Sequence, residues 1–294
     1  MNYAGTMINR TKYKGLFVTD LDGTLLTDAK TFNKRDLDAL QTLRDQGYAV
    51  AIATGRSDYS FHTLMASLGM RGSNFYPAID YVLFSTGAGI ISYPAESLLK
   101  SISLSASDVS VIVEYLEVSR LDYMVHMAVP DTHQFFYRQH SEQNSDFSRR
   151  LDIYSEYATV LPEGRLPLPQ GATEVLCIVP RSKGREITNR IAAEFNQFSV
   201  IRATSPLDGE SSWIEIFDPR VSKSKGVAWL AEQLGIATEN TCAVGNDYND
   251  EDLLHWAEHS YIVRNSPARL QELFQVVASN NEGGVSEVIA HWLG

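Results

Sequence analysis

The sequence has little cysteine, no long apolar run and no excess of basic residues. Its 294 residues include only two cysteines, Cys177 and Cys242, too few for a disulfide framework. Both lie in apolar runs, which is typical of buried free thiols in a reducing compartment. No apolar stretch reaches the ~20 residues that a membrane-spanning helix needs. The polar segment 1–14 lacks the apolar centre of a signal peptide, so we expect a cytoplasmic protein that does not bind membranes.

The charge balance is acidic, with 36 Asp and Glu against 25 Lys and Arg and a net charge of −11. Nucleic acids and anionic membranes bind basic patches, so we expect neither as a partner. The histidines and cysteines show no spacing typical of a zinc site. Apolar residues make up 44% of the chain, enough for a packed core in one large or two modest domains. An anionic ligand would therefore depend on a few local cations.

The most informative segment, 20–24, reads Asp-Leu-Asp-Gly-Thr and follows an apolar run that predicts a short buried strand. Asp20 and Asp22 lie two residues apart, so they point to the same side of that strand end. Two neighbouring carboxylates cost stability unless a cation such as Mg²⁺ compensates them. One acid could attack a phosphorus centre while the other moves a proton. Alone, the segment is more typical of a solvated Asp-Gly turn.

A second segment suits a phosphate group. Thr54, Gly55 and Arg56 follow a predicted strand at 48–53 and precede a predicted helix at 58–68. A small hydroxyl, free backbone N–H groups at a helix start and a cation are the groups that bind phosphate. The alternative is an ordinary strand-to-helix turn with a capping hydroxyl.

A third segment places Lys223 and Lys225 just before a predicted amphipathic helix that ends near Gly235. Cations are slightly unfavourable at a helix N-terminus, so a lysine there indicates a bound anion or a solvated turn. A fourth segment crowds Asn246, Asp247 and Asp250 ahead of another helix. These side chains either cap that helix or supply the oxygen ligands that Mg²⁺ prefers.

The organisation of the chain favours an α/β fold. Predicted strands and helices alternate from residue 16 to about 86 and again from residue 213 to the end, which indicates a Rossmann-like parallel sheet. Ligands bind such sheets at the carboxyl ends of the strands, where the four segments fall. We therefore predict a discontinuous core, 1–90 and 209–294, with an inserted α+β cap at 91–208.

In this order the four segments resemble those of the haloacid dehalogenase-like (HAD) hydrolase superfamily. The best match is its Cof-type branch of sugar-phosphate phosphatases, which carry a large C2 cap. The chain departs from that pattern at Asn246, where the family usually has Asp. It departs again at Thr86, where the family often has Asn before the Gly-Ala pair.

The resemblance implies a Mg²⁺-dependent phosphatase that hydrolyses small phosphorylated metabolites, sugar phosphates above all, through an aspartyl-phosphate. Asp20 would be the nucleophile and Asp22 the acid and base. Thr54 and Lys225 would neutralise the phosphate oxygens, with Lys223 as the alternative lysine. The remaining implied residues bind the substrate (Leu21, Gly55, Arg56, Gly87, Asn249) or the metal (Asp20, Asp22, and one of Asn246, Asp247 and Asp250, left open).

Two other functions stay open. A phosphotransferase or phosphomutase would use the same intermediate, and a non-catalytic phospho-acceptor module would use the same core. Within the cap, Tyr137, Arg138 and Arg202 are candidates for selecting the leaving group. We expect a monomer or a small homo-oligomer.

Overall fold

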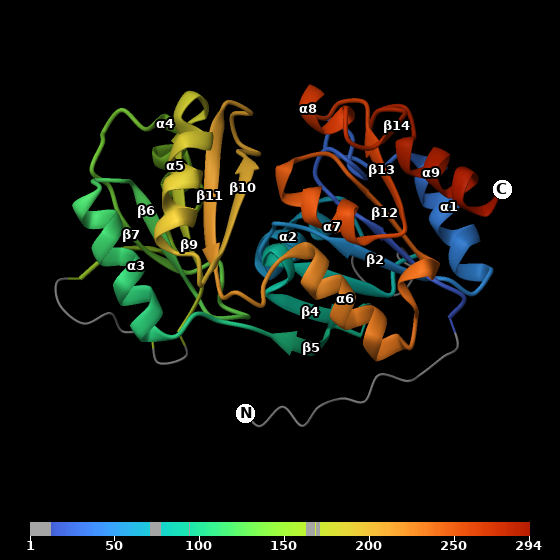
Figure 1. Ribbon diagram of the computed structural model, residues 1–294, viewed down its shortest axis with the longest axis horizontal. Helices are drawn as coiled ribbons and strands as arrows, with labels where there is room; N and C mark the ends of the chain where they lie inside the picture. Colours follow the sequence, from blue (N-terminus) through green and yellow to red (C-terminus); the bar gives the residue numbers. More distant parts are fainter. Residues whose placement is uncertain (1–12, 71–77, 94, 163–167, 169–170) are drawn as a thin grey trace. The chain divides into compact units, whose positions relative to one another are not determined.

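The computed structural model describes residues 13–70, 78–93, 95–162, 168 and 171–294 (Figure 1). Most of the N-terminal segment 1–14 lies outside these residues. The chain divides into two compact units. The first holds the chain up to Arg56 together with Phe61–Lys100 and Ser222–Gly294, and the second holds Ser57–Ser60 and Ser101–Val221.

The first unit is built on an eight-stranded sheet. Its strands, in sheet order, are β14 (Gln275–Val277), β13 (His259–Val263), β12 (Thr241–Gly245), β1 (Leu16–Thr19), β2 (Ala49–Ala53), β3 (Tyr81–Phe84), β4 (Gly89–Ser92) and β5 (Ser97–Ser101). The six strands from β14 to β3 run parallel, and β4 pairs antiparallel with β3. Figure 1 shows β12 and β2, far apart in the sequence, on the same sheet. The predicted α/β fold with a parallel sheet at its core is confirmed.

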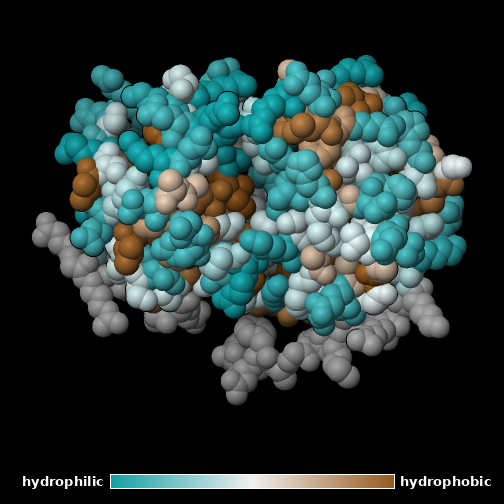
Figure 2. Space-filling model, viewed as in Figure 1, coloured by the Kyte–Doolittle hydropathy of each residue, from teal (hydrophilic) through white to brown (hydrophobic). Residues whose placement is uncertain are grey.

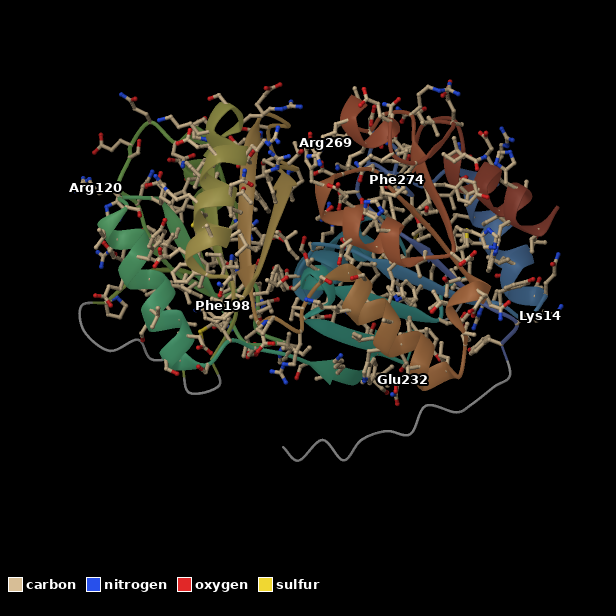
Figure 3. All side chains as sticks on the ribbon, viewed as in Figure 1. Lys14, Arg120, Phe198, Glu232, Arg269 and Phe274 are labelled. Carbon is tan, nitrogen blue, oxygen red and sulfur yellow. The ribbon has the colours of Figure 1, made fainter. Side chains whose placement is uncertain are left out.

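Helices cover both faces of this sheet, because its strands are apolar on both sides. They are α1 (Lys34–Asp45), α2 (Asp58–Ser67), α6 (Lys223–Leu234), α7 (Glu251–Trp256), α8 (Ala268–Gln271) and α9 (Gly284–Leu293). Leu16 and Val18 pack towards α6 and α7, and Phe274, labelled in Figure 3, packs at the rim of that core. Phe17 points to the other face, where its ring lies 6.1 Å from that of Trp292 on α9.

The second unit contains a six-stranded sheet that is antiparallel except for its last pair. Its strands, in sheet order, are β10 (Ser199–Thr204), β11 (Ser211–Phe217), β9 (Ala172–Pro180), β6 (Tyr123–Met127), β7 (Phe135–Arg138) and β8 (Ala158–Val160). Helices α3 (Ala106–Val118) and α5 (Arg181–Glu194) cover one face, with Phe198 packed against that core (Figure 3). Helix α4 (Ser145–Ile153) places Phe147 in the core on the other face. Both cysteines are buried and free.

The second compact unit begins and ends later than the expected insert at 91–208. Strands β4 and β5 extend the first sheet, so the chain leaves that sheet only near residue 101. Strand β11 pairs with β9 and β10 of the second sheet, although its apolar sequence is like that of the core strands. These two pairings place the unit boundaries at 101 and 221.

Both units present mostly hydrophilic side chains on the face drawn in Figure 2, with apolar ones in small patches. In the part of the chain that the structure describes, no helix is both long enough and apolar enough to cross a membrane.

Candidate active site

The site lies at the carboxyl ends of neighbouring strands in the first unit. Asp20 directly follows β1, Thr54 follows β2, and Asn246 follows β12. Asp20 donates its backbone N–H to the carbonyl of Val244 at 2.9 Å, and Thr54 donates to Leu83 at 2.8 Å. The strand pairing thus brings three of the segments that the sequence singled out to one edge of the sheet.

A buried ion triad forms the centre of this edge. The Lys223 Nζ lies 2.7 Å from Asp20 Oδ1 and 2.6 Å from Asp250 Oδ1. The side chains of Lys223 and Asp250 are completely buried, and that of Asp20 is 7% exposed. A buried charge persists only when partners at this distance compensate it, so the triad fixes all three side chains.

The electrostatics of the triad favour a further cation. Burial raises the pKa of Asp20 to about 7, and the negative charge of Asp250 adds to the rise, although the Lys223 ammonium opposes it. Burial also disfavours the charged form of Lys223, but the two carboxylates outweigh it and raise the pKa of this lysine above its usual value. When Asp20 is ionised, the two carboxylates and one ammonium leave a net negative charge in a buried place.

The lysine in the triad is Lys223, which the sequence offered only as the alternative to Lys225. Ser222 is the N-cap of α6, and its side chain accepts from the backbone N–H of Lys225. Lys223 is therefore the first helical residue and reaches back to the strand ends, whereas Lys225 is exposed. Gly87 fixes this approach, because a Cβ there would lie 2.7 Å from the Ser222 carbonyl oxygen. Gly87 thus has a packing role beside α6.

Asp250 has hydrogen-bond partners on both carboxylate oxygens. Oδ1 faces Lys223, and Oδ2 accepts the backbone N–H groups of Asn246 at 2.8 Å and Asp247 at 3.0 Å. Asp247 in turn caps the turn Tyr248–Asp250 through the Asp250 N–H. These contacts assign Asp250 to holding Lys223 and Asp247 to shaping the loop.

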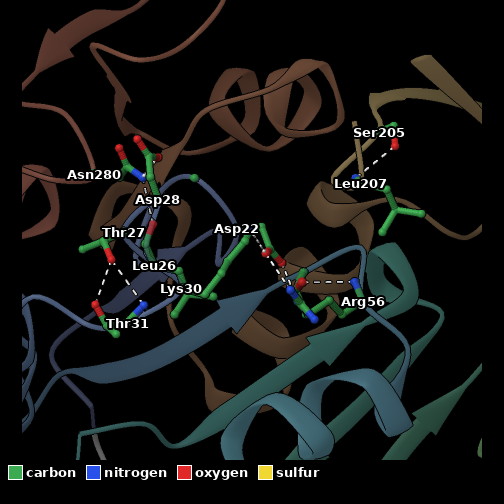
Figure 4. Close-up of polar contacts among 12 residues, drawn as sticks. Asp22, Leu26, Thr27, Asp28, Lys30, Thr31, Arg56, Ser205, Leu207 and Asn280 are labelled. Carbon is green, nitrogen blue, oxygen red and sulfur yellow. Dashed lines mark hydrogen bonds and ion pairs between the residues drawn. The ribbon is translucent and has the colours of Figure 1, made fainter. Parts of the chain in front are cut away.

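The second acid, Asp22, is held by cations (Figure 4). Arg56 donates to it through Nε and Nη2, at 2.5 and 2.7 Å, and Lys30 Nζ lies 3.0 Å from Oδ1. Burial favours the protonated form, but Arg56 and Lys30 outweigh it and lower the pKa of Asp22. Asp22 is a carboxylate in this arrangement. The sequence identified Arg56 as a phosphate contact and missed Lys30 altogether.

Thr54 is bonded to the turn that follows it. Its Oγ1 accepts the backbone N–H of Arg56 at 3.1 Å. A Cβ on Gly55 would lie 3.6 Å from Asn249 Nδ2 and 3.7 Å from Thr86 Oγ1, so both polar side chains border Gly55. Thr86 has a φ of 57°, which is rare for a β-branched residue. The side chain of Leu21 is buried, so only its backbone could contact a ligand.

The residues present fit a single hard cation at Asp20. Asp20 Oδ2 is buried and has no hydrogen-bond partner among the described residues, which is costly unless a cation or ligand binds it. A Cβ on Gly23 would lie 2.5 Å from Asn246 Nδ2, so the Asn246 side chain abuts the turn that carries the Asp22 carbonyl. Within the described ranges no three His, Cys, Asp or Glu side chains form a metal cluster. The fit therefore depends on three groups: the Asp20 carboxylate, the Asp22 backbone carbonyl and the Asn246 side-chain amide.

The expected cap residues differ in their contacts within the second unit. Arg138 Nε lies 3.0 Å from Glu117 Oε1, and its Nη2 donates to the Leu161 carbonyl at 3.3 Å. These contacts give Arg138 a structural role in joining β7 to α3. Tyr137 packs, partly buried, against the core on the α4 face.

Comparisons with known proteins agree with this geometry. The family model of haloacid dehalogenase-like hydrolases matches residues 17–289. The pyridoxal phosphate phosphatase YbhA of Escherichia coli is 25% identical over 272 residues, which cover 89% of this chain and 92% of that protein. The 5-amino-6-(5-phospho-D-ribitylamino)uracil phosphatase YitU of Bacillus subtilis is 22% identical over 284 residues, 94% of this chain and 97% of that protein.

The fold is also similar to that of the HAD subclass IIB sugar phosphatase BT4131, with a TM-score of 0.73 at 16% identity. The match covers 95% of this chain and 98% of that one. The expected enzyme class, a phosphoric monoester hydrolase of this family, is confirmed by relatives named as phosphatases. The chain belongs to the haloacid dehalogenase-like hydrolase family.

Proposed function

We propose that the protein hydrolyses phosphate monoesters of small metabolites, sugar phosphates among them, with Asp20 as the nucleophile. The observation that carries this proposal is the environment of Asp20. One of its oxygens is held by the buried Lys223, and the other is buried with no hydrogen-bond partner among the residues that the structure describes. The two phosphatase relatives act on different phosphate monoesters, which supports the reaction type and leaves the leaving group open.

The reaction proceeds in two displacements. Asp20 attacks the phosphorus, the bond from phosphorus to the ester oxygen breaks, and Asp22 gives its proton to the leaving alcohol. Asp22 then takes a proton from the water that attacks the phosphorus of the aspartyl-phosphate, which releases phosphate and restores Asp20. Because a bound phosphate brings negative charge close to Asp22, it raises the pKa of this acid and permits its protonation.

Lys223 and Thr54 stabilise the phosphate oxygens as charge builds up on them. In this role Lys223 takes the place that the sequence assigned to Lys225. The buried ammonium is already oriented by Asp250, so little reorganisation is needed when the phosphate arrives.

We further propose that Mg²⁺ binds through Asp20, the Asp22 carbonyl and Asn246. The ion would supply positive charge that offsets the negative charge of the nucleophile and of the phosphate. Asp250 is not among the proposed ligands because both of its oxygens already have partners. The second unit is proposed to be the cap that selects substrates, with Tyr137 and Arg202 as candidates and Arg138 as a structural residue.

The test of the nucleophile is Asp20→Asn. It should abolish turnover and phosphate labelling of the protein, while Asp22→Asn should still accept phosphate from p-nitrophenyl phosphate. Near wild-type turnover by Asp20→Asn on any phosphate ester would refute the proposal. Adding an alcohol as competing acceptor and analysing the products separates hydrolysis from phosphotransfer.

The metal site is tested by binding as well as by activity. Asn246→Asp adds a carboxylate and should tighten Mg²⁺ binding measured by calorimetry, whereas Asn246→Ala should weaken it. Asp247→Ala is the matched control and should change the affinity less. A greater loss with Asp247→Ala would assign the ligand to that residue instead.

A further inference from the structure

The hydrogen bonds to Asp22 are distributed unequally between its two oxygens (Figure 4). Oδ1 accepts from Arg56 Nη2 and from Lys30 Nζ, at 2.7 and 3.0 Å. Within the described residues, Oδ2 accepts from Arg56 Nε alone. A carboxylate oxygen has two lone-pair positions, so Oδ1 is saturated and Oδ2 keeps one position free. The two oxygens of Asp22 thus differ in their partners, because Lys30 donates to Oδ1 and not to Oδ2.

The chain delivers Lys30 to this position through a tight turn at 27–31. Thr27 donates its backbone N–H to the carbonyl of Thr31 at 2.9 Å, and Lys30 donates its own to Thr27 at 2.9 Å. The Thr31 N–H also donates to Thr27 Oγ1 at 3.2 Å. Lys30 itself has a φ of 56°, a left-handed conformation that few non-glycine residues adopt.

Two asparagines near the C-terminus fasten the turn to the rest of the first unit. Asn280 Nδ2 donates to Asp28 Oδ1 at 3.0 Å and to the Leu26 carbonyl at 2.9 Å. Asn281 Nδ2 donates to Asp28 Oδ2 at 2.8 Å, and its Oδ1 accepts the Asp28 N–H at 3.0 Å. Asn280 is completely buried, although Lys30 at the tip of the turn is 48% exposed. These contacts fix Asp28 and Leu26, and with them the turn that carries Lys30.

We propose that Lys30 is a positioning residue for the reaction. By occupying Oδ1 of Asp22, it directs the proton that is exchanged with the leaving alcohol to Oδ2. The turn 27–31, anchored through Asp28 to Asn280 and Asn281, holds Lys30 in place for this purpose. The inference rests on the proposed role of Asp22 as acid and base.

The experiment compares the first chemical step for two esters in single turnover. Glycerol 2-phosphate has an alkoxide leaving group that must be protonated, whereas p-nitrophenyl phosphate releases a phenolate that needs no proton. Lys30→Met should slow alcohol release from glycerol 2-phosphate about tenfold, a fraction of the ~10²–10⁴ that proton transfer contributes. It should change nitrophenolate release less than about twofold, and Lys30→Arg should restore most of the loss.

Lys34→Met is the matched control, because Lys34 forms an exposed ion pair with Asp38 on α1. It should leave both rates unchanged. An equal loss on both esters with Lys30→Met, or no loss on either, would overturn the inference. If Asp22→Asn itself fails to discriminate between the esters, the proposed function of Asp22 fails instead.

The anchor is tested away from the reacting atoms. Asn281→Ala removes an exposed tether, and the purified variant should retain its melting temperature within a few degrees. It should slow alcohol release from glycerol 2-phosphate in the wild-type background but not in the Lys30→Met background, because coupled residues are not additive. Equal effects in both backgrounds would show that the tether does not act through Lys30.

Discussion

The two units bury polar side chains in opposite ways. The first unit buries Asp20, Lys223 and Asp250 as an ion triad whose N–O distances are 2.7 and 2.6 Å. The second unit buries His126 and Glu174, and burial shifts the pKa of each towards its neutral form. Burial lowers the pKa of His126 to about 3, and burial together with Glu215 raises that of Glu174 well above its usual value.

The neutral groups of the second unit lie close to a single cation. His126 donates from Nδ1 to the Thr132 carbonyl at 2.7 Å, and its Nε2 lies 3.5 Å from Arg150 Nη2. The Arg150 guanidinium also lies 4.5 Å from the centre of the Trp213 ring. His126 pairs with Glu174 across β6 and β9, so these two side chains point to the same face of the sheet.

The difference indicates what each arrangement is for. A buried charge is expensive, and the first unit tolerates three of them only because they compensate one another. Such a cluster is preorganised for a ligand that carries charge. A buried group that stays neutral avoids the cost of burying a charge. It makes stability depend on pH, because the unfolded chain ionises where the folded site does not. We therefore expect charge substitutions to act mainly on the first unit, and His126 and Glu174 to make the stability of the second unit depend on pH.

The largest effect should come from Lys223→Met. It leaves two carboxylates buried without their cation, which typically destabilises a protein by about 3–5 kcal/mol. It also removes a charge from the proposed phosphate site, for which the loss in kcat should be about 10²–10³-fold. Urea unfolding and phosphatase assays measure the two effects.

Two further variants sharpen this result. Lys225→Met, two residues along the same helix at an exposed position, should change stability by less than about 0.5 kcal/mol. Combining Lys223→Met with Asp250→Asn should recover part of the stability without recovering activity, because one uncompensated carboxylate is removed. If Lys225→Met is the more damaging substitution, the assignment of the lysine is reversed.

Much of the fold follows from local patterns in the sequence. Alternating strands and helices predict a parallel sheet, and strand ends carrying Asp20, Thr54 and Asn246 must then meet at one edge. Those placements need no knowledge of side-chain contacts. Helix α1 likewise has local signals at its ends, since Asn33 is its N-cap and Gln46 its C-cap.

Other features depend on contacts that local patterns do not contain. Two residues along a helix differ by about 200° in direction, so the choice between Lys223 and Lys225 depends on Ser222 being the N-cap. Lys30 lies beside Asp22 on a turn whose Asp28 is bonded to Asn280 and Asn281, near the other end of the chain. The later boundary of the second unit likewise depends on the pairing of β11.

Acidification should destabilise the second unit through His126. Below pH 6.5 the unfolded chain takes up a proton that the folded site, with its pKa of about 3, refuses. Stability is therefore present above pH 6.5 and lost as the pH falls towards 3, at up to about 1.4 kcal/mol per unit. Between pH 7 and pH 5 this site should cost about 2 kcal/mol, measured by urea unfolding at both values.

The control for this prediction lies in the other unit. His126→Gln should flatten the dependence on pH, whereas His255→Gln, at an exposed position of α7, should leave it unchanged. An unaltered slope in His126→Gln would mean that His126 is already charged in the folded protein. His126 would then no longer distinguish the second unit from the first, and only Glu174 would.

The smallest effect should come from Glu174→Gln, and its sign is opposite to that of His126. Because burial first, and the neighbouring Glu215 second, raise the pKa of Glu174 despite Arg150, the folded state keeps a proton that the unfolded chain loses above pH 4.5. The stability that this proton confers is present below pH 4.5 and is lost as the pH rises through the folded pKa. Glutamine keeps the shape and the neutral state, so Glu174→Gln should raise stability at pH 8 and hardly at all at pH 5, measured by urea unfolding at both values. The control is Glu186→Gln, at an exposed position of α5 in the same unit, which should leave stability unchanged at both pH values. A loss of stability at pH 8 would show that Glu174 is ionised and paired with Arg150, and the second unit would then bury its charges as the first does.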